Sequence, residues 1–156
     1  MGKLLILYIF ISSNLFHSIT FAEVDLLEDY CTKLDGVVKF GFICPKSKLP
    51  LPINMCQFTN SHGKQQFFDG CTGPTGGYKE LFYPACIKHD LCYHHEPATN
   101  DLEQKDCDTL FLTIMKKSCH DQPDKKDCLK WANTLYRGVR MVGKLAFHCE
   151  NTKGAY

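Results

Sequence analysis

The chain has 156 residues, 22% of them charged, a formal net charge of +1 and ten cysteines. This near-neutral balance lacks the excess of basic residues that nucleic acid binding requires, so we exclude nucleic acid as a partner. The length is that of a single domain, and an even, high cysteine count in a short chain is typical of exported proteins held together by disulfides.

The first 22 residues have the layout of a secretory signal peptide. Lys3 precedes an apolar run, Leu4–Ile11, and the segment ends in the small residue Ala22. The run is too short to cross a bilayer, which takes about 20 residues. We therefore expect cleavage after Ala22, which leaves residues 23–156 as a single secreted domain.

Residues 23–68 predict an irregular lobe held by disulfides. The segment Val37–Ile43 has the composition of a strand. The prolines within residues 45–52 exclude a long helix before Cys56.

A glycine-rich loop, Asp69–Gly77, follows the lobe and contains four glycines in nine residues. Glycine permits positive φ angles, so such a loop can turn backbone carbonyls or amides towards an ion. Most glycine-rich loops are only turns, and this loop by itself indicates no function.

Three helices are predicted after the loop. The first begins at Pro84, which suits an opening helical position, and ends before Pro97. The second begins at Asn100, whose side chain can cap it, with Glu103 completing a capping box. The predicted fold is therefore mainly α and disulfide-rich.

The third helix begins near Asp124 and continues past Ala146. One of its faces carries four basic side chains at helical spacing. We favour a solvated face, with attraction to anionic lipid as the alternative. The four residues are Lys130, Arg137, Arg140 and Lys144.

The nine residues from Ala85 to Tyr93 contain two cysteines, a histidine and an aspartate, and they allow three interpretations. A zinc site would use Cys86, His89 and Cys92, but an oxidising compartment argues against free thiolates. A structural interpretation bridges the two cysteines in opposite directions and leaves His89 and Asp90 as surface residues. The third interpretation is a catalytic helix.

The catalytic interpretation depends on Cys107-Asp108 in the second helix. A Cys92–Cys107 bridge would clamp the two helices antiparallel and bring Asp108 near His89, one turn before Cys92. A histidine bonded to a buried carboxylate is a general base, and without a G-x-S-x-G elbow the nucleophile is water.

Asp90 points about 100° around the helix from His89 and can face the glycine-rich loop, where carboxylate and carbonyl oxygens suit calcium. Together these groups predict ester hydrolysis.

These residues resemble a known family. Cys86-x-x-His89-Asp90-x-Cys92-Tyr93 is similar to the active-site helix of secreted phospholipases A2, and Cys107-Asp108 is similar to the Cys-Asp pair of their second catalytic helix. The flanking sequence, FYPACIKHDLCYHH, is closer to the conodipine-type and bacterial or fungal branches than to the pancreatic and venom ones. The resemblance covers about residues 69–128.

The resemblance implies calcium-dependent hydrolysis of the sn-2 ester of glycerophospholipids at a membrane surface. His89 would be the general base, Asp108 its orienting acid, and Tyr93 a hydrogen-bond donor to that acid. The implied architecture is two antiparallel catalytic helices with a calcium-binding loop and a third, C-terminal helix.

The resemblance implies a calcium (Ca²⁺) site with Asp90 as one ligand. In the alignment that we prefer, the Asp69 side chain and the Gly70 carbonyl complete the protein ligands. The alternative alignment replaces Asp69 by carbonyls at Thr72 and Pro74.

The resemblance also implies three disulfides, Cys71–Cys86, Cys92–Cys107 and Cys119–Cys128. It leaves open the partners of the remaining cysteines, which are Cys31, Cys44, Cys56 and Cys149.

The aromatic residues near the loop belong to the core or, as the less favoured alternative, form a membrane-inserting rim; they are Phe67, Phe68, Phe82 and Tyr83.

A monomer is expected. The less favoured alternative is cleavage at Lys116-Lys117 or Lys125-Lys126, which would give two disulfide-linked chains.

The rival function is a secreted toxin or ligand that binds a receptor or channel. The intact set of His89, Asp90 and Asp108 argues against it, because a pure binding protein has no need of all three.

Overall fold

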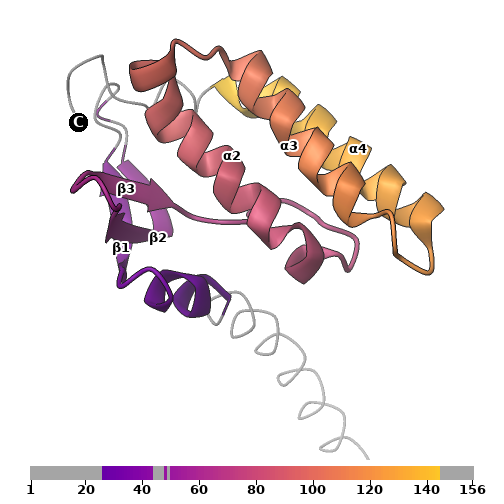
Figure 1. Cartoon of the computed structure of the whole chain (residues 1–156), viewed down its shortest axis with the longest axis horizontal. Helices are drawn as coiled ribbons and strands as arrows, with labels where there is room; N and C mark the ends of the chain where they lie inside the picture. The colour runs from indigo at the N-terminus through magenta and orange to yellow at the C-terminus, as the bar shows by residue number, and fades with distance from the viewer. Residues whose placement is uncertain (1–25, 44–47, 49, 145–156) are drawn as a thin grey trace, which may run out of the picture.

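The computed structural model describes residues 26–43, 48 and 50–144. The predicted signal peptide, Cys44 and Cys149 lie outside these residues. The prediction that the third helix continues past Ala146 is wrong, because the helix ends at Val142 and Gly143 is its C-cap. The described chain starts with a short helix over residues 26–32 and continues through a small sheet into three long helices (Figure 1). Among the described residues, no helix is long and apolar enough to cross a membrane.

The lobe before the glycine-rich loop is built on a three-stranded antiparallel sheet. Its strands are β1 (Val37–Ile43), β2 (Pro50–Thr59) and β3 (Gln65–Phe68), in the order β1-β2-β3. The strand predicted at Val37–Ile43 is confirmed, whereas the prediction of an otherwise irregular lobe is wrong. Pro50 is tolerated because it opens its strand, and Pro52 falls where the pairing of β1 with β2 is irregular.

The first long helix is α2 (Lys79–Asn100). It starts five residues before Pro84 and runs through Pro97, although Pro84 was the predicted start and Pro97 the predicted limit. The predicted bounds are therefore wrong at both ends. The neighbours of Pro84, which are Phe82, Tyr83 and Ala85, are almost completely buried, while Pro84 itself is exposed. Burial of these side chains offsets the one backbone hydrogen bond that a proline removes.

The second and third long helices are α3 (Gln104–Ser118) and α4 (Lys125–Val142). The predicted cap at Asn100 is wrong, because α2 extends to that residue; the capping box of α3 pairs Glu103 with Asp106 instead. The predicted start of α4 is confirmed, since the Asp124 side chain accepts a hydrogen bond from the backbone N–H of Asp127. Figure 1 shows α3 running back along α2, with α4 behind it.

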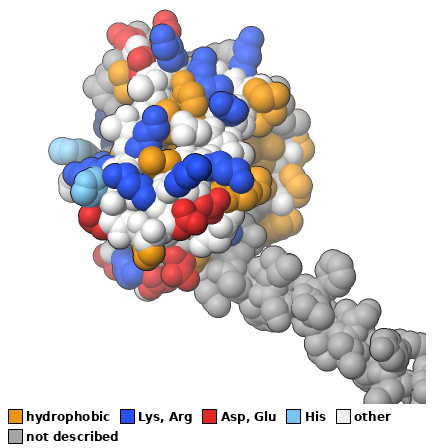
Figure 2. Space-filling view, turned by 90° about the vertical axis from the view of Figure 1, so that its right-hand side faces the viewer, with side chains coloured by type: hydrophobic (Ala, Val, Ile, Leu, Met, Phe, Trp, Pro, Cys, Tyr) orange, Lys and Arg blue, Asp and Glu red, His pale blue; other side chains and the backbone are white. Residues whose placement is uncertain are grey.

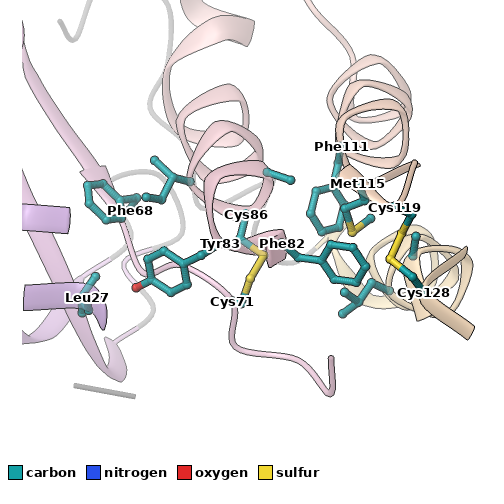
Figure 3. Close-up of a cluster of buried hydrophobic side chains, with 14 of the residues drawn as sticks. Leu27, Phe68, Cys71, Phe82, Tyr83, Cys86, Phe111, Met115, Cys119 and Cys128 are labelled. Atoms are coloured by element: carbon teal, nitrogen blue, oxygen red, sulfur yellow. A yellow bond between two sulfur atoms is a disulfide. The ribbon is translucent and has the colours of Figure 1, made fainter. Parts of the chain in front are cut away.

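The core lies on both sides of α2. Figure 3 shows Tyr83 pointing towards Leu27 and Phe68 on the sheet side, and Phe82 pointing towards Phe111 and Met115 on the helix side. Phe68, Phe82 and Tyr83 are almost completely buried, at 0%, 0% and 1% exposure. These three aromatic residues therefore belong to the core and do not form a membrane rim. Phe67 is half-buried and packs against a second small cluster that contains Phe42 and Met55.

The described cysteines are all paired, in four disulfides. Three of them are the pairs that the resemblance implies, Cys71–Cys86, Cys92–Cys107 and Cys119–Cys128. The fourth, Cys31–Cys56, ties the first helix to the sheet. Because Cys86 and Cys92 are both bridged, the zinc interpretation is wrong. The fold class is confirmed in its coarse form: mainly α and disulfide-rich, with a small sheet.

Both dibasic pairs lie in helices at one end of the molecule. Lys116-Lys117 is in the last turn of α3, and Lys125-Lys126 opens α4; all four side chains are exposed. Figure 2 shows Lys and Arg side chains gathered over the end where these two helices turn. Cleavage of the chain there stays the less favoured alternative.

Candidate active site

The structure brings His89 on α2 and Asp108 on α3 into direct contact. His89 Nε2 lies 2.8 Å from Asp108 Oδ1, and the two residues are 7% and 0% exposed. The Cys92–Cys107 disulfide joins the two helices beside this contact. Cys92 lies one helical turn after His89, and Cys107 is the residue before Asp108. The interpretation of His89 as a simple surface residue is therefore wrong.

The surroundings of His89 fix its ring. It lies between the rings of Tyr93 and Phe111, with centroids at 4.0 and 4.7 Å. When Nε2–H donates to Asp108, the neutral ring carries its free lone pair on Nδ1. This leaves Nδ1 as the proton acceptor of the site.

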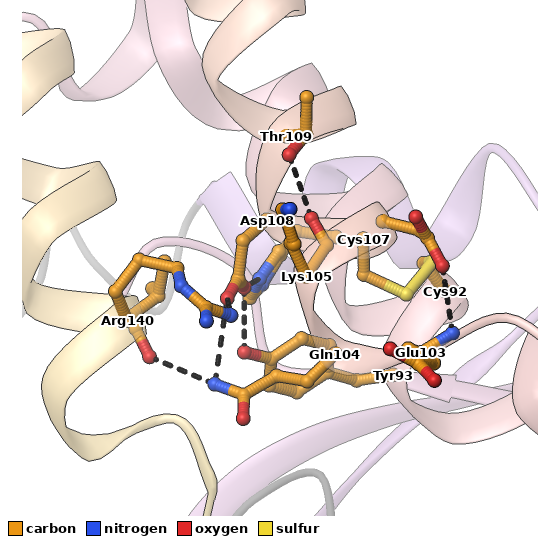
Figure 4. Close-up of polar contacts among 12 residues, drawn as sticks. Cys92, Tyr93, Glu103, Gln104, Lys105, Cys107, Asp108, Thr109 and Arg140 are labelled. Atoms are coloured by element: carbon orange, nitrogen blue, oxygen red, sulfur yellow. Dashed lines mark hydrogen bonds and ion pairs between the residues drawn. A yellow bond between two sulfur atoms is a disulfide. The ribbon is translucent and has the colours of Figure 1, made fainter.

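Asp108 is a buried carboxylate with donors on both oxygens. Tyr93 OH donates to Oδ1 at 2.6 Å, while Arg140 Nη1 at 2.7 Å and Gln104 Nε2 at 3.4 Å donate to Oδ2. Figure 4 shows these three side chains converging on the acid from all three long helices. A buried charge is tolerated only when it is paired and hydrogen-bonded in this way.

These contacts set the protonation of the site. Burial alone would raise the pKa of Asp108, but hydrogen bonds from His89, Tyr93 and Arg140 outweigh it and hold that pKa below its usual value. Burial, together with the bond to Asp108, raises the pKa of the Tyr93 hydroxyl. Asp108 is therefore ionised and Tyr93 is a neutral donor at neutral pH.

Two of these donors were missed by the sequence analysis. Gln104 stands four residues before Asp108 on α3, which is the spacing of neighbours on a helix face, so a local signal existed. Arg140 was assigned only to the basic stripe of the third helix. It lies 32 residues from Asp108, and no local pattern connects them.

Asp90 lies beside the start of the glycine-rich loop. Its Oδ2 accepts hydrogen bonds from the backbone N–H groups of Asp69, at 3.1 Å, and Gly70, at 2.8 Å. Burial raises the pKa of Asp90 well above its usual value, and the neighbouring Asp69 carboxylate, by its charge and by hydrogen bonding, raises it further. The two acids thus form a close pair.

This acid pair fits the chemistry of a calcium ion. Two adjacent carboxylates repel each other unless a proton or a cation lies between them, and calcium prefers oxygen ligands of this kind. Asp69, Asp90 and the Gly70 carbonyl are the residues that could hold it. Thr72 and Pro74 are exposed positions further along the same loop. Among the described residues, no group of three or more His, Cys, Asp or Glu side chains is placed to hold a metal ion, so further ligands would be carbonyls and water.

Gly70 is the residue that sets the start of the loop. Its φ is +79°, and a Cβ built there would lie 2.5 Å from the hydroxyl oxygen of the buried Tyr83. We expect Gly70→Ala to lower the free energy of unfolding by roughly 3 kcal/mol or more, because it adds backbone strain and overpacking. Denaturant unfolding under oxidising conditions measures this loss.

Gly77→Ala is the matched control for that variant. Gly77 also has a positive φ, +90°, but a Cβ there meets nothing within 4 Å. The control should lose only the backbone part, about 1–2 kcal/mol. Equal losses in the two variants would show that Tyr83 moves aside and that overpacking contributes nothing.

His89 of the dyad and both acids of the pair line one cavity of about 500 Å³, while Asp108 is buried behind the ring of His89. Its polar lining includes Asp69, Gly70, His89 and Asp90. Its remaining walls are largely apolar and come from β2 and α4, which lie far apart in the sequence; they include Leu51, Ile53, Leu135, Val139 and Val142. A site of this size, apolar with a few convergent polar groups, suits a small organic ligand that is mostly hydrocarbon.

No family model, curated protein or solved structure matches this chain. The assignment of function therefore rests on the residues and geometry of the site.

Proposed function

We propose that the chain is a secreted, calcium-dependent esterase that cleaves the sn-2 ester of glycerophospholipids, as phospholipases A2 do. The observation that carries the proposal is the 2.8 Å contact of His89 with the buried Asp108 in the wall of a largely apolar cavity. The cavity offers an apolar surface for an acyl chain, and its lining includes a base for the ester.

In the proposed reaction, His89 Nδ1 takes a proton from a water molecule, and the resulting hydroxide attacks the ester carbonyl carbon. Asp108 stabilises the imidazolium that forms and keeps the ring in place. When the tetrahedral intermediate collapses, the C–O bond to the glycerol oxygen breaks and His89 returns the proton to that oxygen. The products are a fatty acid and a lysophospholipid.

Asp90, Asp69 and the Gly70 carbonyl are the residues that we assign to calcium. Bound there, the ion would polarise the ester carbonyl and stabilise negative charge on its oxygen. Asp90 and His89 are adjacent on α2 and both line the cavity, which supports an ion and a base acting on one ester.

The proposed partner is a membrane surface. Ile43 and Val142, at 63% and 68% exposure, are apolar side chains close to the cavity: Val142 lines it, and Ile43 pairs with Pro50 beside the lining residue Leu51. Exposed apolar side chains of this kind support docking on lipid. We propose that the chain docks as a secreted monomer.

The test is fatty acid release from phospholipid vesicles that carry distinguishable labels at the sn-1 and sn-2 positions. We expect release of the sn-2 chain with calcium, and loss of release when a chelator is added. Release that resists the chelator would contradict the calcium assignment. Binding to vesicles or cells without release under any condition would instead favour a toxin or ligand that acts by binding.

A further inference from the structure

The C-terminal end of α4 contacts Asp108 directly through Arg140, and it also lies against Gln104 and Tyr93, two other residues that donate to this acid. Arg140 donates to Asp108 Oδ2 at 2.7 Å, and Gln104 joins that same oxygen, at 3.4 Å, to the carbonyl of Val139, at 3.2 Å. Gly143 is buried, and a Cβ there would lie 2.5 Å from the hydroxyl of Tyr93. The acid is thus fixed by α4 as well as by its own helix pair.

The donors divide the two oxygens of Asp108 between them. Oδ1 receives His89 and Tyr93 from α2, whereas Oδ2 receives Gln104 from α3 and Arg140 from α4. The cationic donor makes the shorter bond to Oδ2, and charge-assisted bonds are about twice as strong as neutral ones. Without it, Oδ2 would keep a single long bond to a neutral amide, and the carboxylate could turn.

We propose that Arg140 is a positioning residue of the dyad: its guanidinium holds Asp108 Oδ2 and thereby keeps Oδ1 directed at His89. Arg140 acts through Asp108 and does not touch the substrate space. In the described part of the chain, the cavity lining passes through Val139 and Val142 on α4 and leaves out Arg140 between them. Its side chain is 36% exposed, so the cation remains partly hydrated while the acid that it holds is fully buried.

The effect on catalysis, which rests on the proposed function, should fall on kcat. Since Arg140 lies outside the cavity lining, its loss should leave KM within about twofold of the original value. A misplaced dyad should lower kcat by roughly 10- to 100-fold. A residue that only supported the fold would not produce this separation of kcat from KM.

A readout that does not require turnover is the titration of the Asp108 carboxyl carbon by NMR in the whole secreted chain. In Arg140→Gln, we expect the carboxyl to titrate at a higher pH than in the original chain, because a cation at 2.7 Å from Oδ2 is lost. Arg140→Lys keeps the charge but not the planar fork, and it should fall between the original chain and the glutamine variant in both titration and kcat.

Arg137→Gln is the matched control, since Arg137 is an exposed arginine one turn earlier on the same helix. It should change neither the Asp108 titration nor kcat. The inference is overturned if Asp108 titrates in Arg140→Gln as it does in the original chain, or if Arg137→Gln moves it as far. Should the glutamine variant fail to fold, a lysine variant identical to the original chain in both readouts overturns the inference.

The two readouts separate this inference from the proposed function. A shifted Asp108 titration in a chain that hydrolyses no phospholipid would support the contact and refute the function. Calcium-dependent hydrolysis together with an Asp108 titration that does not change in Arg140→Gln would support the function and refute the positioning role of Arg140.

Discussion

His89→Gln is expected to reduce phospholipid hydrolysis by about 10²- to 10⁴-fold, the usual contribution of a general base. Glutamine retains an N–H that can donate to Asp108 Oδ1 in place of His89 Nε2, so the buried acid stays paired and the fold is preserved. Glutamine has no nitrogen lone pair that accepts a proton near neutral pH. The loss should therefore appear in kcat, measured as fatty acid release at saturating vesicle concentration.

His62→Gln is the control, because His62 is an exposed histidine in the turn between β2 and β3 and does not line the cavity. It should be as active as the original chain. Urea unfolding of the His89 variant should show a midpoint close to that of the original chain. A His89→Gln protein that still hydrolyses the sn-2 ester at a comparable rate would refute the base assignment.

The meeting of His89 and Asp108 could be predicted because two steps were local and the resemblance implied the disulfide that joins them. One helical turn relates His89 to Cys92, Cys107 is next to Asp108, and a disulfide between the two cysteines fixes the rest. The cap at Asp124 is also local, because the side chain and the backbone it binds are three residues apart.

The errors at α2 arose where the local signal was weak or misleading. The helix starts after Tyr78, which makes no side-chain capping bond, so Pro84 was the strongest start signal in the sequence. Asn100 could have capped a new helix, but α2 extends to it, and Glu103 with Asp106 forms the capping box instead. Propensity and capping decide a boundary only where packing does not override them.

The parts that could not be predicted depend on pairings distant in the sequence. Strand β2 contains two prolines and β3 begins with two glutamines, and they form a sheet only because β2 pairs with β1 and β3 pairs with β2. The sheet matters for function because Leu51 and Ile53 of β2 form one wall of the cavity. Arg140 is a second case: a residue on a basic stripe is distinguished from its neighbours only by the acid that it reaches.

Asp90→Asn is expected to abolish both calcium binding and calcium-dependent hydrolysis. The asparagine oxygen can still accept hydrogen bonds from the backbone N–H groups of Asp69 and Gly70, so the loop keeps its anchor. The variant lacks the charge that attracts a divalent cation, and calcium affinity depends on the number of charged ligands. Without calcium the variant should be at least as stable as the original chain, because the repulsion between Asp90 and Asp69 is gone.

The chain carries its own reporter of this site in Trp131, its single tryptophan. The indole lies directly against Gly76 of the glycine-rich loop, where an added Cβ would collide with the ring. Calcium should change the fluorescence of Trp131 in the original chain, and at about 100 times its dissociation constant it should stabilise the fold by about 2.7 kcal/mol. Neither response should occur in Asp90→Asn.

Glu80→Gln is the matched control, since it removes one negative charge from the exposed first turn of the same helix. It should respond to calcium as the original chain does, which separates loss of a ligand from loss of net charge. If Asp90→Asn binds calcium with unchanged affinity, the ion is held elsewhere. The raised pKa of Asp90 would then reflect only a proton shared between two neighbouring acids, and the ester carbonyl would need another source of polarisation.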